Sequence, residues 1–215
     1  KMRRGVATVG QAFTARPARR KAAPYVRDET GTLRSSLETL YSTFDHVDAA
    51  SDPVHIVRRY RSAEDREIVG FCAAALAFGR VASVLHSIES LLAVMGPAPA
   101  DYVRSFDPAL GRRRLAPLVH RWIRGRDLAA LLMILRRMLE ESGSIEQFFL
   151  TGDDPLTSDV EAALEAFSTR ALETDLRPVY GRMSPRAGVR YFFPRPSAGS
   201  GCKRLNLFLR WMVRR

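Results

Sequence analysis

Cysteine is scarce in this sequence of 215 residues, and no long apolar run is present. The only two cysteines, Cys72 and Cys202, lie far apart, so we predict no disulfide framework and a reducing compartment, the cytoplasm. The longest apolar run, Ile68 to Phe78, has about half the length that a membrane crossing needs. The N-terminus lacks the apolar core of a secretory signal. We therefore expect a soluble protein with no membrane partner.

Acidic residues are also few, because 23 Asp and Glu stand against 34 Lys and Arg. The net charge of +11 and the pI near 10.5 favour an anionic partner, with nucleic acid as the first candidate. A solvated basic tail is the alternative interpretation, because several basic residues lie ahead of Asp28. These are Lys1, Arg3, Arg4, Arg16, Arg19, Arg20, Lys21 and Arg27.

Metal-ligand spacing is missing as well. The histidines at 46, 55, 86 and 120 are scattered, and the two cysteines add no motif to them. Asp65 and Glu67 would point to different sides of a helix, so we interpret Asp65 as a capping residue and not as half of an acid–base pair. The sequence predicts no metal and no other cofactor.

Helical periodicity covers most of the chain after a basic arm at 1–31 that we predict to be disordered. We expect one helical domain over 32–215, incomplete at its C-terminal end, with an all-α fold in the form of a multi-helix orthogonal bundle. The expected helices begin at Leu33, at Asp52-Pro53 and at the capping sequence Ser62–Asp65, then cover 81–95, 98–106, 108–122 and 127–141, and resume at a capping box from Ser158 to Glu161. Val189 to Phe193 is the only candidate strand, and Pro185, Gly188, Pro194 and Pro196 disfavour a helix in this region.

The residues at the start of the last predicted helix are of the kinds that bind a phosphate group. Gly199, Ser200 and Gly201 precede it, and glycines let a ligand approach backbone N–H groups at a helix start. Lys203 falls in the first turn, where a cation is unfavourable unless an anion offsets it. One helix face would be apolar, with Leu205, Phe208, Leu209 and Met212, and another polar, with Lys203, Asn206, Arg210 and Arg214.

The string Gly-x-Gly-x-Lys-x-x-Asn at 199–206 resembles the hairpin and following helix of helix-hairpin-helix DNA glycosylases of the endonuclease III type. The resemblance implies that Gly199 and Gly201 bind a DNA phosphate and that Lys203 is the nucleophile, which attacks the sugar to form a Schiff base. In that superfamily an essential aspartate follows the lysine helix. We expect it beyond Arg215, so whether the protein is an enzyme stays open.

A second resemblance covers roughly 35–215. The strings Asp65-Arg-Glu-Ile-Val-Gly-Phe, Ala77-Phe-Gly-Arg-Val and above all Phe193-Pro-Arg-Pro-Ser-Ala-Gly-Ser-Gly-Cys-Lys-Arg-Leu-Asn are similar to the bacterial family called domain of unknown function 2400. Members of that family continue into a segment of Leu-Asp-Thr-His type, similar to the one that bears the glycosylase aspartate. This likeness favours a glycosylase-like fold.

Two further basic segments have two interpretations each. Between 177 and 195, arginines including Arg190 and Arg195 alternate with Tyr180, Tyr191, Phe192 and Phe193, which suits a nucleic-acid surface, although the aromatics could instead be core. A second basic patch or a solvated face would contain Arg112, Arg113, Arg114, Arg121, Arg124 and Arg126.

The sequence thus predicts a DNA-binding protein of glycosylase type, with Lys203 as its catalytic residue. The predicted nucleic-acid contacts are Gly199, Ser200, Gly201, Arg204, Asn206, Arg210, Arg190 and Arg195. A nucleic-acid binder without catalysis and a helical interaction protein with no nucleic-acid role are the alternatives.

Overall fold

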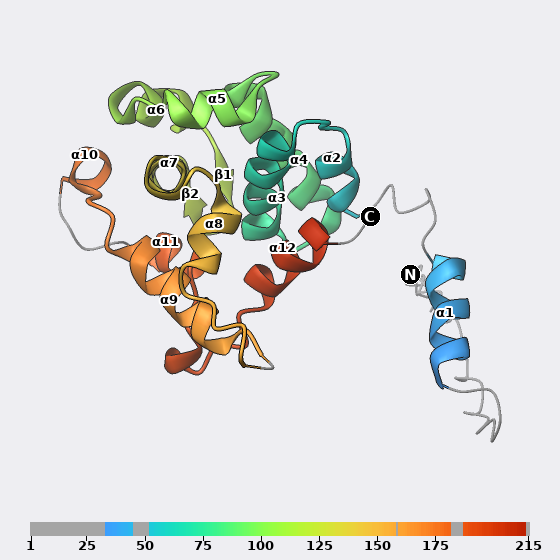
Figure 1. Ribbon diagram of the computed structural model, residues 1–215. Helices are drawn as coiled ribbons and strands as arrows, with labels where there is room; N and C mark the ends of the chain where they lie inside the picture. The colour runs from blue at the N-terminus through green and yellow to red at the C-terminus, as the bar shows by residue number, and fades with distance from the viewer. Residues whose placement is uncertain (1–32, 45–51, 158, 182–186, 214–215) are drawn as a thin grey trace, which may run out of the picture. The chain divides into compact units, whose positions relative to one another are not determined.

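The computed structural model describes residues 33–44, 52–157, 159–181 and 187–213 (Figure 1). The predicted arm at 1–31 lies outside these ranges. The chain divides into two units, 1–45 and 46–215. Within the first unit, the predicted helix is confirmed as α1 (Leu33–Phe44), on which Leu37 and Leu40 are both exposed.

The second unit is built almost wholly of helices, which confirms the all-α class. Its first half contains α2 (Val54–Arg58), α3 (Ala63–Leu76), α4 (Val81–Met95), α5 (Pro99–Arg104), α6 (Pro108–Leu115), β1 (Val119–His120) and β2 (Ile123–Arg124). Its second half contains α7 (Gly125–Ser142), α8 (Ile145–Leu150), α9 (Glu161–Leu172), α10 (Arg177–Tyr180), α11 (Ala187–Phe192), the 3₁₀ turn η2 (Pro196–Ala198) and α12 (Lys203–Val213).

A hydroxyl and two carboxylates hold the starts of three helices, α3, α5 and α8. The Ser62 hydroxyl accepts the N–H of Asp65 at the start of α3, as the sequence predicted. The Asp65 carboxylate caps a different helix, because it accepts the N–H of Ala100 at 2.9 Å in α5. Glu67 does the same for α8, accepting the N–H groups of Ile145 and Glu146 at 2.9 and 2.6 Å. The two carboxylates therefore fasten separate helices to α3.

Three local predictions were wrong, and one helix was not predicted. The helix expected over 108–122 ends at Leu115, because Pro117 cannot continue it, and an antiparallel hairpin with His120 opposite Ile123 follows. The candidate strand at 189–193 lies mainly in α11, and its hydrophobic residues face the core instead of alternating. The helix expected to open at Ser158 begins at Glu161, whose N–H is accepted by Asp159, and Ser158 itself lies outside the described residues. α8 was not anticipated.

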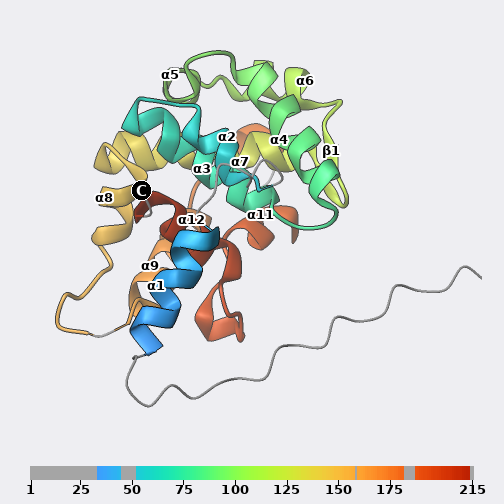
Figure 2. The same ribbon diagram turned by 90° about the vertical axis from the view of Figure 1, so that its right-hand side faces the viewer.

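The core lies between α3, α7 and α12. α3 is buried on every side from Ile68 to Leu76. Phe71 at its centre contacts the rings of Phe193 and Phe208, with centroids at 5.5 and 5.2 Å. α7 runs through the middle of the unit, with α5 and α6 on one side and α11 and α9 on the other (Figures 1 and 2).

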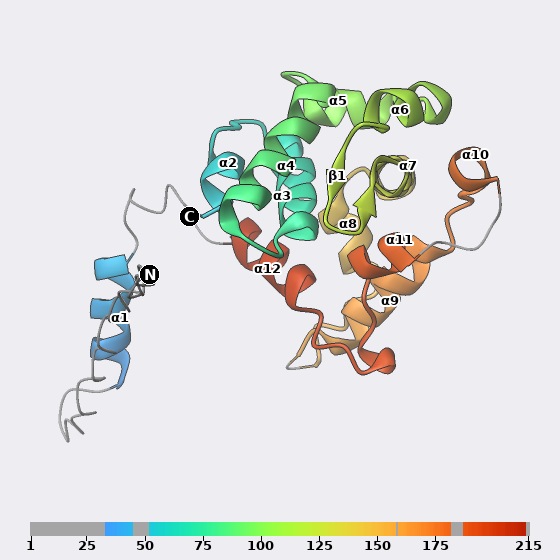
Figure 3. The same cartoon turned by 180° about the vertical axis from the view of Figure 1, so that it is seen from behind.

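α12 packs along α3, and this contact positions the glycine–lysine segment (Figure 3). A Cβ on Gly70 would lie 2.5 Å from Cε of Met212, so the small residue on α3 leaves room for this flexible side chain of α12. Leu205 and Phe208 are buried as predicted, and Trp211, which the predicted apolar face left out, is also buried. The start of α12 is therefore held by its own core contacts.

Candidate nucleic-acid interface

The connection 193–202 between α11 and α12 is fastened against α9. The Ser168 hydroxyl donates to the carbonyl of Pro194 at 2.8 Å. Glu165 accepts both the N–H and the hydroxyl of Ser197, at 2.9 and 2.8 Å, and the bond from this N–H is the main cause that lowers the pKa of Glu165. Phe193 anchors the connection in the core. These contacts hold the connection in one conformation.

The glycine turn, Gly199–Gly201, is the open end of this connection. Gly199 has a φ of +73°, in the left-handed region that favours glycine, and its N–H donates to the carbonyl of Pro196. Gly199 and Gly201 are exposed, and a Cβ added at either would meet nothing within 4 Å. The backbone of the turn is therefore accessible to a ligand.

The amides that follow the turn are free. Cys202, with a φ of +46°, precedes α12 and is buried; its thiol donates to the carbonyl of Pro194, and burial raises its pKa. A cysteine in this place offers no oxygen to cap the helix. Among the described residues, no atom accepts the backbone N–H groups of Lys203, Arg204 or Leu205. These amides and the helix dipole form a site that favours an anion.

Lys203 is exposed at the first position of α12, and no carboxylate in the described part of the chain pairs with it. Asn206 and Arg210, one and two turns further along, are exposed too, which confirms the predicted polar face as far as Arg210. The Asn206 amide also donates to the carbonyl of Gly201 at 3.2 Å and so links the helix to the turn. Arg214 lies outside the described residues.

Arg204 turns away from the glycine turn. Its side chain is half-buried, with the guanidinium 3.4 Å from the Tyr191 ring centroid, and Nη2 donates to the Tyr191 carbonyl. Burial lowers the pKa of Arg204, and its Nε is buried without a partner among the described residues. Arg204 therefore joins α12 to α11, which differs from the direct contact with nucleic acid that the sequence predicts.

The aromatic residues of 177–195 do not form the predicted surface. Phe192 and Phe193 are each only 1% exposed, because α11 directs them into the core. The Tyr180 hydroxyl donates to Asp127 at 2.7 Å. Arg190 is exposed, and Arg195 lies 4.0 Å from Glu165. Tyr180 and Tyr191 are half-buried, and Arg177, Arg190 and Arg195 are exposed.

A different aromatic surface, which the sequence analysis missed, lies beside Tyr191. Phe78, Trp122 and Tyr191 form what we call the aromatic platform, with ring centroids 4.8 to 5.2 Å apart. Trp122 is 50% exposed, and the guanidinium of Arg121 lies 5.6 Å from its ring centroid. In the sequence, the signal for this surface was Trp122 between Arg121 and Arg124. Arg204, stacked on Tyr191, connects the platform to α12.

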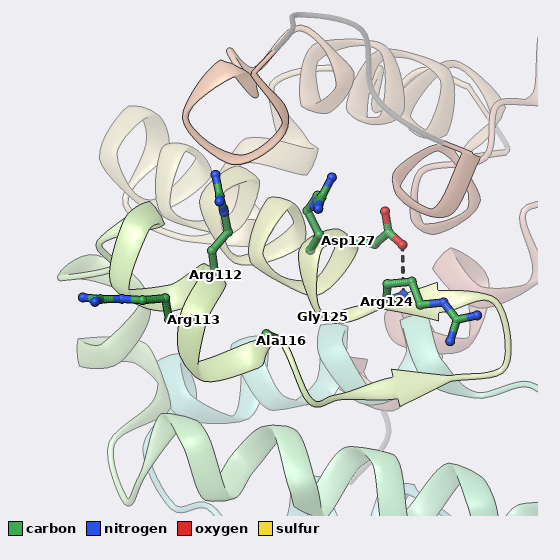
Figure 4. Close-up of a pocket in the computed structure, with 7 residues that line it drawn as sticks. Arg112, Arg113, Ala116, Arg124, Gly125 and Asp127 are labelled. Carbon is green, nitrogen blue, oxygen red and sulfur yellow. Dashed lines mark hydrogen bonds between the residues drawn. The ribbon is translucent and has the colours of Figure 1, made fainter.

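The arginines of the second basic patch separate into two groups. Arg112, Arg113, Arg124 and Arg126 line one pocket of about 380 Å³ between α6 and the start of α7, whereas Arg114 and Arg121 do not line it (Figure 4). We call this the arginine pocket.

Other kinds of site find no support in the described ranges. They contain no group of three or more His, Cys, Asp or Glu that could hold a metal ion. No helix in them has the length and apolarity to cross a membrane. His120 is buried, and its Nε2 donates to the carbonyl of Phe78 at 3.0 Å while Nδ1 lies 2.9 Å from the Ser87 hydroxyl.

Comparison with known proteins gives one result. The model of a family described as a protein of unknown function, DUF2400, matches residues 52–215, and the chain therefore belongs to this family. No curated protein and no solved structure matches the chain.

Proposed function

We propose that this member of the DUF2400 family binds nucleic acid, with DNA as the first candidate, at the glycine turn and the start of α12. The observation that carries the proposal is the set of free backbone amides at the start of α12, next to an exposed Lys203 that has no ion-pair partner among the described residues. A phosphate at this place would accept hydrogen bonds from the amides and pair with the ammonium group.

The local electrostatics support an anion and oppose an empty site. The first turn of α12 holds no acidic residue, so both the helix dipole and Lys203 place positive charge there. The two glycines leave room for the sugar–phosphate backbone to approach. The contacts of Glu165 and Ser168 hold the turn in position before a ligand arrives, which lowers the entropy cost of binding.

The aromatic platform supplies a surface for bases. The Trp122 side chain is 50% exposed. The guanidinium of Arg121 lies near the Trp122 ring, and that of Arg204 lies over the Tyr191 ring. Aromatic faces with arginine beside them are the usual means of holding unstacked bases. Arg204 ties the platform to the phosphate-binding turn, so one flipped or single-stranded nucleotide could use both surfaces.

We further propose a helix-hairpin-helix fold of the glycosylase type. The order of α11, the connection 193–202 and α12 supports it, since a short helix, a glycine turn and a second helix follow one another. With an abasic site, the amine of Lys203 would add to C1′ of the open-chain sugar, and water would leave as the imine forms. Such chemistry also requires an acid–base residue, so a non-catalytic nucleic-acid binder is the alternative.

Fluorescence anisotropy with labelled duplexes, one intact and one abasic, tests the proposal across a salt series. We expect binding that weakens steeply with salt, and Lys203→Ala should lower affinity and reduce the salt slope by about 1. Lys203→Arg should retain binding because it keeps the charge. Arg66→Ala is the matched control, since Arg66 is exposed on α3, outside the candidate interface.

The outcomes separate the hypotheses. Borohydride trapping of a covalent adduct on the abasic duplex, lost in Lys203→Arg, would support the glycosylase-type reaction. Binding without trapping would favour the non-catalytic binder. Absence of binding even at low salt, with a folded protein by circular dichroism, would reject both and favour a helical interaction protein.

A further inference from the structure

The arginine pocket lies where α6 ends and α7 begins. Arg112 and Arg113 extend from α6 on one side of Gly125, and Arg124 extends on the other side, as Figure 4 shows. Arg126, in the first turn of α7, is the fourth arginine of the wall. The pocket therefore collects cationic side chains from α6, from the end of β2 and from the first turn of α7.

These four arginines have no ion-pair partners in the described part of the chain, and all four are exposed. Elsewhere in the same ranges, arginines such as Arg59, Arg104 and Arg136 each pair with a nearby carboxylate. The pocket thus concentrates uncompensated positive charge.

The single carboxylate of the pocket wall cannot neutralise this charge. Asp127 is 6% exposed, and its two oxygens accept hydrogen bonds from the N–H of Arg124 at 2.9 Å and the hydroxyl of Tyr180 at 2.7 Å. These bonds fix the start of α7 and hold α10. One carboxylate against four guanidinium groups leaves the wall with an excess of positive charge.

The stability of the two helices accounts for only two of the four arginines. Basic residues in the last turn of a helix interact well with its dipole, which accounts for Arg112 and Arg113 on α6. Arg126 lies in the first turn of α7, at the positive end of an 18-residue helix, where a cation is unfavourable. A bound anion would offset this repulsion.

Gly125 makes the pocket possible. A Cβ at this position would lie 1.8 Å from the carbonyl oxygen of Leu115, so only glycine lets the start of α7 rest on the end of α6. This close approach sets the start of α7, which carries Arg126 and follows Arg124, against the end of α6, which carries Arg112. The arrangement depends on tertiary contact and not on sequence proximity.

We propose that the arginine pocket binds a phosphate group. Guanidinium groups match phosphate oxygens with paired hydrogen bonds, and several arginines suit a group of high negative charge. The volume of about 380 Å³ is larger than one phosphate requires and lies in the range of small-ligand sites. The phosphate belongs either to a small phosphorylated molecule or to the backbone of a nucleic acid. This site is separate from the glycine turn, and the proposal does not rest on the proposed function.

Isothermal titration with pyrophosphate at physiological salt tests the proposal. The double variant Arg112→Ala/Arg126→Ala removes one arginine from each wall, and the double variant Arg66→Ala/Arg114→Ala removes two exposed charges outside the pocket as a charge-matched control. We expect saturable binding that weakens roughly tenfold or more in the pocket variant and less than about twofold in the control. Exposed arginines rarely affect folding, and circular dichroism checks this.

A parallel titration with a short single-stranded oligonucleotide identifies the source of the phosphate. If the pocket variant weakens both ligands, the site takes a backbone phosphate; if it weakens pyrophosphate alone, the ligand is a small phosphorylated molecule. Equal loss in the pocket variant and the control, or no saturable pyrophosphate binding by the native protein, would overturn the proposal. Lys203→Ala weakens the anion site proposed at the glycine turn, so saturable pyrophosphate binding that persists in this background and is lost on adding Arg112→Ala/Arg126→Ala belongs to the arginine pocket.

Discussion

Replacing Gly125 with alanine should destabilise the protein strongly, although alanine normally favours a helix. The new Cβ would lie 1.8 Å from the Leu115 oxygen and 2.4 Å from its carbonyl carbon, whereas real contacts essentially never fall under 3.0 Å. Both opposing atoms belong to the backbone, so no side-chain rotation relieves the overlap. The start of α7 would have to move from α6 by more than about 1 Å in a closely packed interior.

The magnitude follows from these contacts. Overpacked side chains cost about 1–3 kcal/mol, and a backbone overlap belongs at the top of that range or above it. Alanine recovers at most about 1 kcal/mol through its helix propensity. We therefore expect a loss of about 3 kcal/mol in the free energy of unfolding, or roughly 6–12 °C in Tm for a unit of this size.

Gly201→Ala is the matched control, because the same methyl group meets nothing within 4 Å there and Gly201 lies outside the left-handed region. Its effect on stability should stay within about 0.5 kcal/mol. Urea unfolding followed by circular dichroism measures both variants. If Gly125→Ala cost no more than Gly201→Ala, the close approach of α6 and α7, and with it the geometry of the arginine pocket, would be refuted.

Three further predictions concern the core, the pH dependence and the glycine turn. Phe71→Ala should lower the free energy of unfolding by about 3–5 kcal/mol in the same urea assay, because the buried ring contacts Phe193 and Phe208. A loss under about 1 kcal/mol would contradict the core described above. Burial lowers the pKa of His120 below its value of about 6.5 in the unfolded chain, so the unfolded state binds more protons at acidic pH. The free energy of unfolding should therefore fall as the pH drops from 7.5 to 5.5. His120→Gln should make this pH dependence flatter, and an unchanged pH dependence would argue against His120 as its cause. Glu165→Ala should speed amide hydrogen exchange at Ser197 and weaken DNA binding while leaving α12 intact, and an unaltered exchange rate would show that Glu165 does not hold the turn.

Local patterns in the sequence were sufficient for most helices. Apolar residues at three- and four-residue spacing, with Ser62 and Gly96 at the ends, define α3 and α4 because caps and periodicity act within one helix. The same reasoning predicted the opening of α12 and its exposed face from Lys203 to Arg210. Membership of the DUF2400 family also follows from sequence alone, since the strings that carry it are contiguous.

The tertiary structure decided which side chains are available for binding. Nothing near Phe192 and Phe193 distinguishes a core aromatic from a surface one, since their burial depends on α7 and on Phe71, far away in sequence. Arg204 lies on a polar helix turn, yet its guanidinium stacks on the ring of Tyr191 in α11 and donates to the Tyr191 carbonyl. A periodic pattern indicates which face of a helix is apolar, but the partner of a charge depends on which elements pack beside it.

The sequence by itself therefore determined the helical class, the excess of positive charge and the glycine–lysine opening of α12, all of which depend on composition or on neighbours within a few residues. Only the tertiary structure decided that Trp122 joins Phe78 and Tyr191, and that arginines of α6 and α7 share one pocket. The physical reason is that both sites form where segments distant in the chain meet, as at Gly125, and such contacts depend on packing.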